Sequence, residues 1–348
     1  METQVYEVDA LSDNRNLYVI VADALAAGSL VALPTETVYG LGADAFLPEA
    51  VARVFEAKGR PVFDPLIVHL ASARDLDTVA EVPEELKEVV EKLSKLFWPG
   101  PMTMVLPKKA IVPDIVTSGL PTVAVRVSAH PVMRGVIRAL GHPVAAPSAN
   151  RFGRISPTCA SAVMKELDGA IEMVLDAGAC SDGLESTIVF PTFDEKGKAC
   201  IEILRDGPVT REQFRNIVKV LRKKKPASDA TDAPDKPVAP GQLPSHYAPS
   251  KKLILVEPDA EFIPEEGVRY GLLSYEGDSP LAELHDWESL VVMSPGNGRL
   301  AEAAVRLFAL MRQMDEDDSI DVIVAEAVPT KGLGTAMMDR LRRASAKS

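Results

Sequence analysis

The sequence has few of the features that mark secreted, membrane-spanning or zinc-binding proteins. Its 348 residues include only three cysteines, Cys159, Cys180 and Cys200. They are odd in number and form no C-x-x-C pair, which argues against a disulfide framework or a zinc site and suits a reducing compartment. No apolar run approaches the roughly 20 residues of a membrane helix, and the N-terminus METQVYEVDA lacks the pattern of a secretory signal. We therefore expect a cytoplasmic protein.

The chain also has fewer basic than acidic residues. The chain has 38 lysines and arginines against 50 acidic residues, a net charge of −12. This balance argues against a protein that grips a nucleic-acid backbone over a wide face, although it leaves room for a local basic pocket that binds one polyphosphate. Hydrophobic residues make up 47% of the chain and charged residues 25%, as in a globular protein, and the length suggests two domains.

Several common catalytic motifs are missing. The five histidines are scattered, and neither H-E-x-x-H nor H-x-x-E-H occurs, so the sequence predicts no protein-held transition metal. There is no G-x-S-x-G elbow for acyl-enzyme chemistry and no G-x-x-x-x-G-K-[ST] phosphate loop. What is present is a set of short polar stretches, each next to an expected strand or helix end.

The first 221 residues alternate between helical and strand-like patterns, which favours an α/β layer fold. Some expected strands follow one another without a helix between them, so a mixed sheet is predicted. The expected helices are 17–27, 48–57, 83–97, 131–140, 157–167 and 210–221. The expected strands are 29–33, 65–70, 102–106, 122–127, 143–146, 171–175, 186–190 and 200–204.

A polar, proline-rich stretch at 222–240 divides the chain and reads as a linker. Beyond it the alternation resumes, with strands expected at 252–256, 269–274, 289–293 and 320–324, and helices at 299–314 and 331–343. We predict an α/β domain over residues 1–221, a linker that also acts as a lid over 222–249, and a smaller α/β domain over 250–348.

The stretch LPTETVYGLGADA at 33–45 contains a G-x-G-x-x-A spacing typical of dinucleotide-binding turns. Gly40 follows the expected strand end at Leu33 by seven residues, and the next helix begins only near Pro48, so the segment is too long for such a turn. It is then either a plain connection or a site that needs the hydroxyl side chains of Thr35, Thr37 and Tyr39.

Two stretches carry cations in restrained positions. Lys58-Gly59-Arg60-Pro61 ends an expected helix, where the cations either form a stiff anion site or simply cap the helix. In the strand TVAVRV, Arg126 shares a face with small residues, which fits a bidentate anion clamp on a concave wall. An exposed arginine on a half-solvated strand fits the pattern equally well.

Three more stretches place small polar groups at strand or helix ends. They are APSAN at 146–150 with GRISPT at 153–158, DGLEST at 182–187, and PGQLPSHYAP at 240–249. Small hydroxyls and helix N-termini bind phosphate readily, but they also serve as ordinary caps. A tether does not need a His-Tyr pair between prolines, so residues 239–249 are expected to dock, with Tyr247 covering a cleft.

Taken in order, these stretches resemble the threonylcarbamoyl-AMP synthase family, which is built on the YrdC-type domain. PTETVYGL, KGRP before PLIVH, FWPGPMTMVL, VAVRVSAHP, APSAN with GRISPT, and ESTIV carry the resemblance over roughly residues 15–210. PGQLPSHYAP and GLGTAMMDRLRRA are similar to the two-domain form. The resemblance implies that the first domain is a YrdC-type catalytic domain with an open, twisted mixed sheet and helices, and that the second is a smaller Rossmann-like α/β domain. It also implies synthesis of threonylcarbamoyl-AMP from L-threonine, bicarbonate or CO2, and ATP with Mg2+, for later transfer to tRNA by a separate transferase.

The resemblance also implies roles for individual residues. Lys58 and Arg60 are implied to meet the ATP phosphates and to act in catalysis. The residues implied to bind threonine are Thr35, His69, Arg126, Ser148 and Ser186. The residues implied to bind ATP, besides Lys58 and Arg60, are Asp64, Thr122, Asn150, Thr158, Arg205 and Tyr247. Asp64 departs from the family pattern, since an acid near triphosphate either repels it or binds it through magnesium.

Two rival interpretations remain at this stage. Carbamoyl-adenylate-forming enzymes of hydrogenase maturation share the YrdC-type domain, but they resemble longer chains with zinc-finger and acylphosphatase modules, which this sequence lacks. A module that binds double-stranded RNA or tRNA without catalysis could use a concave sheet, with RKKK at 222–225 as a contact. The net charge of −12 counts against it.

Overall fold

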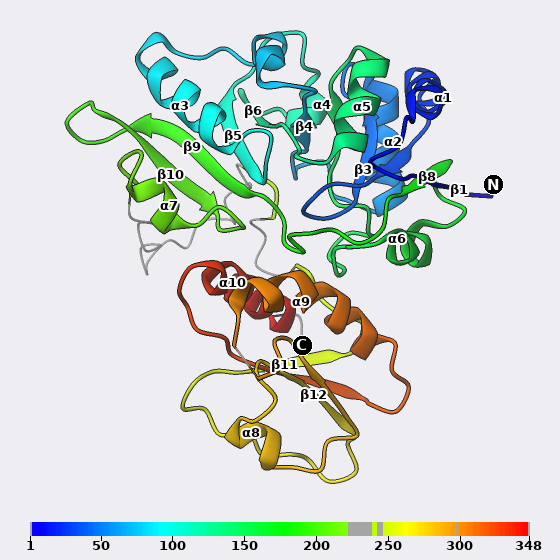
Figure 1. Cartoon of the computed structure of the whole chain (residues 1–348), viewed down its shortest axis with the longest axis vertical. Coiled ribbons are helices and arrows are strands. Elements are labelled where there is room, and N and C mark those ends of the chain that lie inside the picture. Colours follow the sequence, from blue (N-terminus) through cyan, green and yellow to red (C-terminus); the bar gives the residue numbers. More distant parts are fainter. Residues whose placement is uncertain (1, 222–238, 242–245, 297, 347–348) are drawn as a thin grey trace.

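The computed structural model describes residues 2–221, 239–241, 246–296 and 298–346. These residues form two α/β bodies, each built around its own sheet, one above the other in Figure 1. Most of the predicted linker lies outside the described residues. No helix in the described ranges combines the length and the apolar character that crossing a bilayer requires.

The first body contains a mixed sheet of ten strands in the order β1-β8-β2-β3-β7-β4-β6-β5-β9-β10. The strands are β1 (Gln4–Glu7), β2 (Val31–Leu33), β3 (Gly40–Asp44), β4 (Ile67–His69), β5 (Met102–Pro107), β6 (Thr122–Arg126), β7 (Val144–Ala145), β8 (Met173–Asp176), β9 (Thr187–Phe193) and β10 (Ala199–Arg205). The helices are α1 (Arg15–Ala26), α2 (Pro48–Lys58), η1 (Ala73–Thr78), η2 (Glu84–Leu86), α3 (Lys87–Phe97), α4 (Asp114–Thr117), α5 (Pro131–Leu140), α6 (Ala160–Leu167) and α7 (Arg211–Arg215). The predicted mixed sheet is confirmed.

The second body is a four-stranded parallel sheet in the order β11-β14-β12-β13, which confirms a smaller α/β unit of Rossmann-like type. Its elements are β11 (Lys252–Val256), β12 (Tyr270–Ser274), α8 (Pro280–Glu283), β13 (Ser289–Val292), α9 (Leu300–Asp315), β14 (Val322–Glu326) and α10 (Leu333–Ser345). Apart from the short helix α8, which the sequence did not predict, each lies within a few residues of its predicted position, because apolar runs and their caps are local signals.

Two parts of the sequence prediction are wrong. The helix expected over 210–221 ends at Arg215, and Val220 then forms a bridge with Ile201 of β10. The segment after the helix is rich in β-branched residues, which favour extended backbone beside a strand. The predictions also omitted the short strands β1 and β3 and the short helices η1, α4 and α8. β3 contains two glycines, which have low strand propensity.

The G-x-G-x-x-A match falls on β3, which pairs antiparallel with β2 and with β7 and opens no helix. A Cβ on Gly42 would lie 3.0 Å from a Val144 methyl carbon and 3.1 Å from a Leu33 methyl carbon. Gly42 is therefore required by close packing at the centre of the sheet. Gly40, by contrast, lines the pocket described below.

Helices α9 and α10 lie between the second sheet and the first body (Figure 1). Apolar side chains of both bodies form one shared cluster, in which Val38, Ile155 and Leu184 of the first body pack with Leu307 and Met337 of the second. Ion pairs surround this cluster, including Arg312–Glu166 at 2.9 Å and Arg154–Asp315 at 3.0 Å. Burial of shared apolar surface holds the two bodies together.

Candidate functional site

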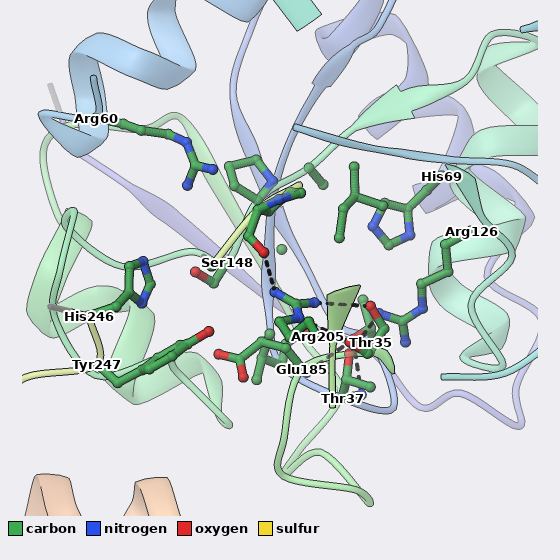
Figure 2. Close-up of a pocket in the computed structure, with 18 residues that line it drawn as sticks. Thr35, Thr37, Arg60, His69, Arg126, Ser148, Glu185, Arg205, His246 and Tyr247 are labelled. Carbon is green, nitrogen blue, oxygen red and sulfur yellow. Dashed lines mark hydrogen bonds between the residues drawn. The ribbon is translucent and has the colours of Figure 1, made fainter. Parts of the chain in front are cut away.

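A pocket lies on one face of the first sheet, where loops from distant parts of the chain meet (Figure 2). Side chains along β4 and β6 alternate between the two faces. Val68 and Val125 face the helix-covered core, while Ile67 and Ala124 lie on the opposite face. The pocket occupies this second face. Its polar and charged lining residues are Thr35, Thr37, Arg60, His69, Arg126, Ser148, Glu185, Ser186, Arg205, His246 and Tyr247.

The register of the sheet brings His69 and Arg126 together. β4 and β6 are parallel neighbours, and His69 is directly opposite Arg126 at their carboxyl ends. β5 approaches from the other side, where Thr103 is the partner of Arg126. Both residues are the last of their strands, so their side chains reach the edge where the loops converge.

Arg126 is held by groups from two loops. Its Nη1 donates to the Thr37 hydroxyl at 2.9 Å and its Nε to the Gly100 carbonyl at 3.3 Å. Its Nη2 forms an ion pair with Oε1 of Glu36 at 2.8 Å. This nitrogen carries two N–H groups, so one of them stays available. The guanidinium is therefore fixed in place by the protein and retains donor capacity toward the pocket.

Glu36 is the carboxylate that balances Arg126. Burial opposes its ionisation, but Arg126, the Ala129 N–H and the Ser128 hydroxyl together lower the pKa of Glu36 to about 2. His69, in contrast, is neutral. Burial and the nearby Arg126 cation lower the pKa of His69 to about 3. At neutral pH the pocket thus holds the neutral imidazole of His69 beside the Arg126 cation, whose charge is balanced by Glu36.

Arg60 enters the pocket from the end of α2. Its Nε donates to the Asp64 carbonyl at 3.1 Å, its Nη2 donates to the Pro65 carbonyl at 2.9 Å, and the Asp64 carboxylate lies 2.9 Å from Nη2. Burial lowers the pKa of Arg60 and raises that of Asp64, and the pair offsets both effects. Asp64 therefore lies behind Arg60 and orients it.

Lys58 has a supporting place beneath the pocket. Its ammonium donates to the carbonyl oxygens of Ser148, at 2.5 Å, and of Asn150. It is 3% exposed, and burial, followed by the nearby Arg60 cation, lowers its pKa well below the usual value. Lys58 thus fixes the turn that carries Ser148, which does line the pocket.

Arg205 and Ser186 form the opposite wall. The Nε of Arg205 donates to the Ser186 carbonyl and its Nη2 to the Ser186 hydroxyl, both at 3.1 Å, and the same hydroxyl lies 2.8 Å from that of Thr103. The Nη1 of Arg205 reaches the Pro240 carbonyl at 3.4 Å. This wall therefore extends from the end of β10 to Pro240, in the described part of the predicted linker.

Tyr247 and His246 close the remaining side. Tyr247 is 1% exposed and adopts a left-handed backbone with φ of 64°. Gly241, with φ of 77°, lies so close that a Cβ there would be 2.8 Å from the Tyr247 hydroxyl and 3.1 Å from Nη1 of Arg205. Burial and the surrounding cations lower the pKa of His246 well below its usual value, while burial raises that of Tyr247.

Buried polar atoms without a hydrogen-bond partner converge on this pocket. Within the described ranges they include His69 Nδ1, His246 Nδ1 and the Tyr247 hydroxyl. Buried polar atoms are nearly always paired in folded proteins. A polar ligand that forms hydrogen bonds with these atoms would therefore supply the partners that they lack.

The structure brings eight of the predicted site residues to the pocket and places five elsewhere. Those lining it are Thr35, Arg60, His69, Arg126, Ser148, Ser186, Arg205 and Tyr247. Lys58, Asp64 and Asn150 lie directly behind lining residues. Thr122 is at the opposite end of β6 from Arg126, and Thr158 lies in a separate recess near α9.

The predicted site residues did not include Glu36, Glu185 and His246, and Thr37 was only one of the hydroxyl residues considered for the loop at 33–45. A signal existed for Glu36, because an acid between two threonines at the end of a buried strand requires a cation partner. Glu185 and His246 lay inside stretches already recognised as polar. Their places became apparent only once the two bodies were assembled.

The residues do not form a metal site of their own. Among the described residues, no group of three or more histidine, cysteine or acidic side chains is placed to hold a metal ion. Of the described residues that line the pocket, only Glu185 carries a carboxylate, and it is engaged by Ser156 and Arg340. Magnesium is therefore considered below only as part of the nucleotide substrate.

Two family models together match most of the chain. A model described as "Telomere recombination" matches residues 23–207, and the model of the threonylcarbamoyl-AMP synthase C-terminal domain matches residues 209–346. The threonylcarbamoyl-AMP synthase of Pyrococcus abyssi is 41% identical over 94% of this chain and 93% of its own. That of Bacillus subtilis is 38% identical over 97% of this chain and 95% of its own.

A solved structure is similar over nearly the whole length. The crystal structure of P. abyssi Sua5 complexed with L-threonine has a TM-score of 0.84 and 37% identity, covering 99% of this chain and 98% of that one. A variant of the same protein, with an adjacent histidine and tyrosine replaced by alanine, has a TM-score of 0.82 and 36% identity, covering 99% and 96%. The agreement includes both bodies, so it extends to their relative placement.

Proposed function

The chain belongs to the threonylcarbamoyl-AMP synthase family, and we propose that its pocket joins L-threonine, bicarbonate or CO2, and ATP to form threonylcarbamoyl-AMP and pyrophosphate. The observation that carries this proposal is the presence of three guanidiniums, from Arg60, Arg126 and Arg205, in one pocket that also holds a neutral His69. Such a site suits two anionic substrates that must be held side by side.

The threonine end of the site is assigned to Arg126, His69, Thr35 and Ser186. Arg126 Nη2 retains donor capacity for a carboxylate. The neutral ring of His69 can accept a hydrogen bond from the threonine ammonium or hydroxyl. This assignment agrees with the bound ligand named for the P. abyssi relative, which is L-threonine.

The nucleotide end is assigned to Arg60, Arg205 and Tyr247, with Lys58 and Asn150 as their support. Arg60 and Arg205 are positioned to offset phosphate charge, and Tyr247 presents a buried ring and hydroxyl. Magnesium is expected to enter with ATP as the MgATP substrate. Roles for Asp64, Thr122 and Thr158 in contact with ATP are less well supported, since none of the three lines the pocket.

The reaction needs positioning and charge compensation rather than a covalent enzyme intermediate. The threonine amine adds to CO2 and loses a proton, which gives a carbamate. A carbamate oxygen then attacks the α-phosphorus of ATP, and pyrophosphate leaves. The carbamate and the triphosphate are both anions and repel each other. Fixed guanidiniums are suited to hold them together, because their positive charge offsets this repulsion. We also propose that the product serves a separate transferase that modifies tRNA.

The test is pyrophosphate release by the purified chain, with the nucleotide product identified by mass spectrometry. Release from ATP should require both L-threonine and bicarbonate, and omission of either should abolish it. Release that is indifferent to threonine, or absent with all three substrates present, would overturn the proposal. A protein that only binds RNA would release no pyrophosphate.

A further inference from the structure

Arg340 on α10 reaches from the second body into the wall of the pocket in the first. Its side chain is fully buried, with 0% exposure. Its Nε donates to Oε2 of Glu185 at 3.1 Å, and its Nη1 donates to the Asp206 carbonyl at 2.7 Å. The guanidinium carbon also lies 5.4 Å from the centre of the Tyr247 ring.

These contacts involve the immediate neighbours of two pocket residues. Glu185 directly precedes Ser186, and Asp206 directly follows Arg205. Ser186 and Arg205 are themselves joined by two hydrogen bonds. Arg340 therefore holds both ends of this wall and the face of Tyr247 at once, although it does not line the pocket itself.

The pairing also sets the charge of the pocket. Glu185 does line it, and Figure 2 shows its carboxylate between Tyr247 and Arg205. Its Oε1 accepts a hydrogen bond from Ser156 at 2.5 Å, and Arg340 supplies the opposing charge at Oε2. Burial opposes the charge on Arg340, yet Tyr247, Glu185 and Asp339 raise its pKa above the usual value.

A buried ion pair is weak support for stability, because well-packed apolar residues are often as good or better. A free carboxylate inside a pocket for anionic substrates would instead be harmful, since it would repel phosphate or pair with Arg205. The second body contributes the cation that prevents this.

We propose that Arg340 is a positioning residue for nucleotide binding, which makes α10 of the second body part of the active site. It neutralises Glu185 and orients Ser186, Arg205 and Tyr247 for the triphosphate substrate. This inference depends on the proposed function in one respect, which is that the triphosphate substrate is ATP.

The test compares Arg340→Met with Arg340→Met/Glu185→Gln in the full-length chain. Arg342→Met is the matched control, because Arg342 is on the same helix but pairs with Glu257 at the surface, at 2.7 Å. ATP binding is measured by calorimetry, and the KM values for ATP and threonine by pyrophosphate release. Arg340→Met should weaken ATP binding about 30-fold or more, the usual effect of leaving a buried charge unpaired, with a smaller change in the threonine KM. The double variant should regain most of the loss, and Arg342→Met should match the wild type.

Rescue by Glu185→Gln is the decisive outcome, because it would show that the unpaired Glu185 carboxylate, and not the lost contacts of Arg340 with Asp206 and Tyr247, weakens ATP binding. Wild-type ATP affinity in a folded Arg340→Met variant would overturn the proposal. So would a folded double variant as defective as the single one. If the wild-type chain binds ATP but releases no pyrophosphate, the proposed function fails, while the ATP-binding comparison still tests Arg340.

Discussion

Glu36 and Arg126 form a buried ion pair of 2.8 Å between the loop after β2 and the end of β6. Their side chains are 8% and 4% exposed. Because the same loop supplies Thr37 to Arg126, the position of this guanidinium depends on two segments about 90 residues apart in sequence. The threonine end of the proposed site is therefore preorganised by the fold.

Removing Arg126 should impair threonine binding far more than ATP binding. Loss of a charge-assisted contact to the substrate carboxylate should raise the threonine KM about 10- to 150-fold. Arg126→Ala alone would leave Glu36 buried and unpaired, so the comparison is made in a Glu36→Gln background. Steady-state pyrophosphate release at varied threonine checks this, and an equal threonine KM in the two folded variants would contradict the clamp.

Arg60→Lys should raise the ATP KM about tenfold while leaving threonine binding largely intact, because lysine keeps the charge but loses the planar fork. Arg53→Lys is the control on the preceding helix α2, since Arg53 is 40% exposed and pairs with Glu172 outside the pocket.

Lys58→Met should affect both substrates, because the Lys58 ammonium holds the turn that carries Ser148. These expectations are checked by measuring the KM values for ATP and threonine while the concentrations of both substrates are varied. If the Arg60 and Lys58 variants both behave as the wild type, the two cations serve as helix caps and not as part of the site.

Folding stability should fall as the pH drops from about 6.5, partly because of His69. Its folded-state pKa of about 3 is below its ordinary value of 6.5, so the unfolded chain binds the proton first in this interval. The stabilisation is complete above pH 6.5 and is lost progressively toward pH 3, by up to about 1.4 kcal/mol per pH unit for one group. Urea unfolding at pH 7, 6 and 5 should show a shallower decline for His69→Asn. Parallel slopes would mean that folded His69 takes up a proton as readily as the unfolded chain.

Gly241→Ala should reduce turnover through a clash with Tyr247 and Arg205. The added Cβ would lie 2.8 Å from the tyrosine hydroxyl in a backbone with φ of 77°. Gly197→Ala is a matched control, because its φ is 71° but no heavy atom lies within 4 Å. Both variants should lose about 1–2 kcal/mol of stability from left-handed strain, and only Gly241→Ala should lose activity at a temperature where both are folded. Equal activities would show that the Tyr247 wall tolerates displacement.

The sequence by itself determined the order of helices and strands, the two α/β units and the family. These rest on local signals: apolar periodicity, caps, proline-rich breaks and short motifs read along one chain. It also indicated most of the lining residues, because polar groups at strand ends converge at the edges of a sheet. The strand β3 escaped notice because its glycines serve packing between neighbours that the sequence does not identify.

Only the tertiary structure decided which charges meet. Arg126 is 90 residues from Glu36, and Arg340 is 155 residues from Glu185. Strand register placed the first pair together, and the packing of α10 against the first body placed the second. The energy of such pairs depends on distance and burial, which are properties of the assembled fold. For that reason Lys58 moved from the phosphate site predicted by sequence to a place behind it, and Arg340 became recognisable as part of the active-site wall.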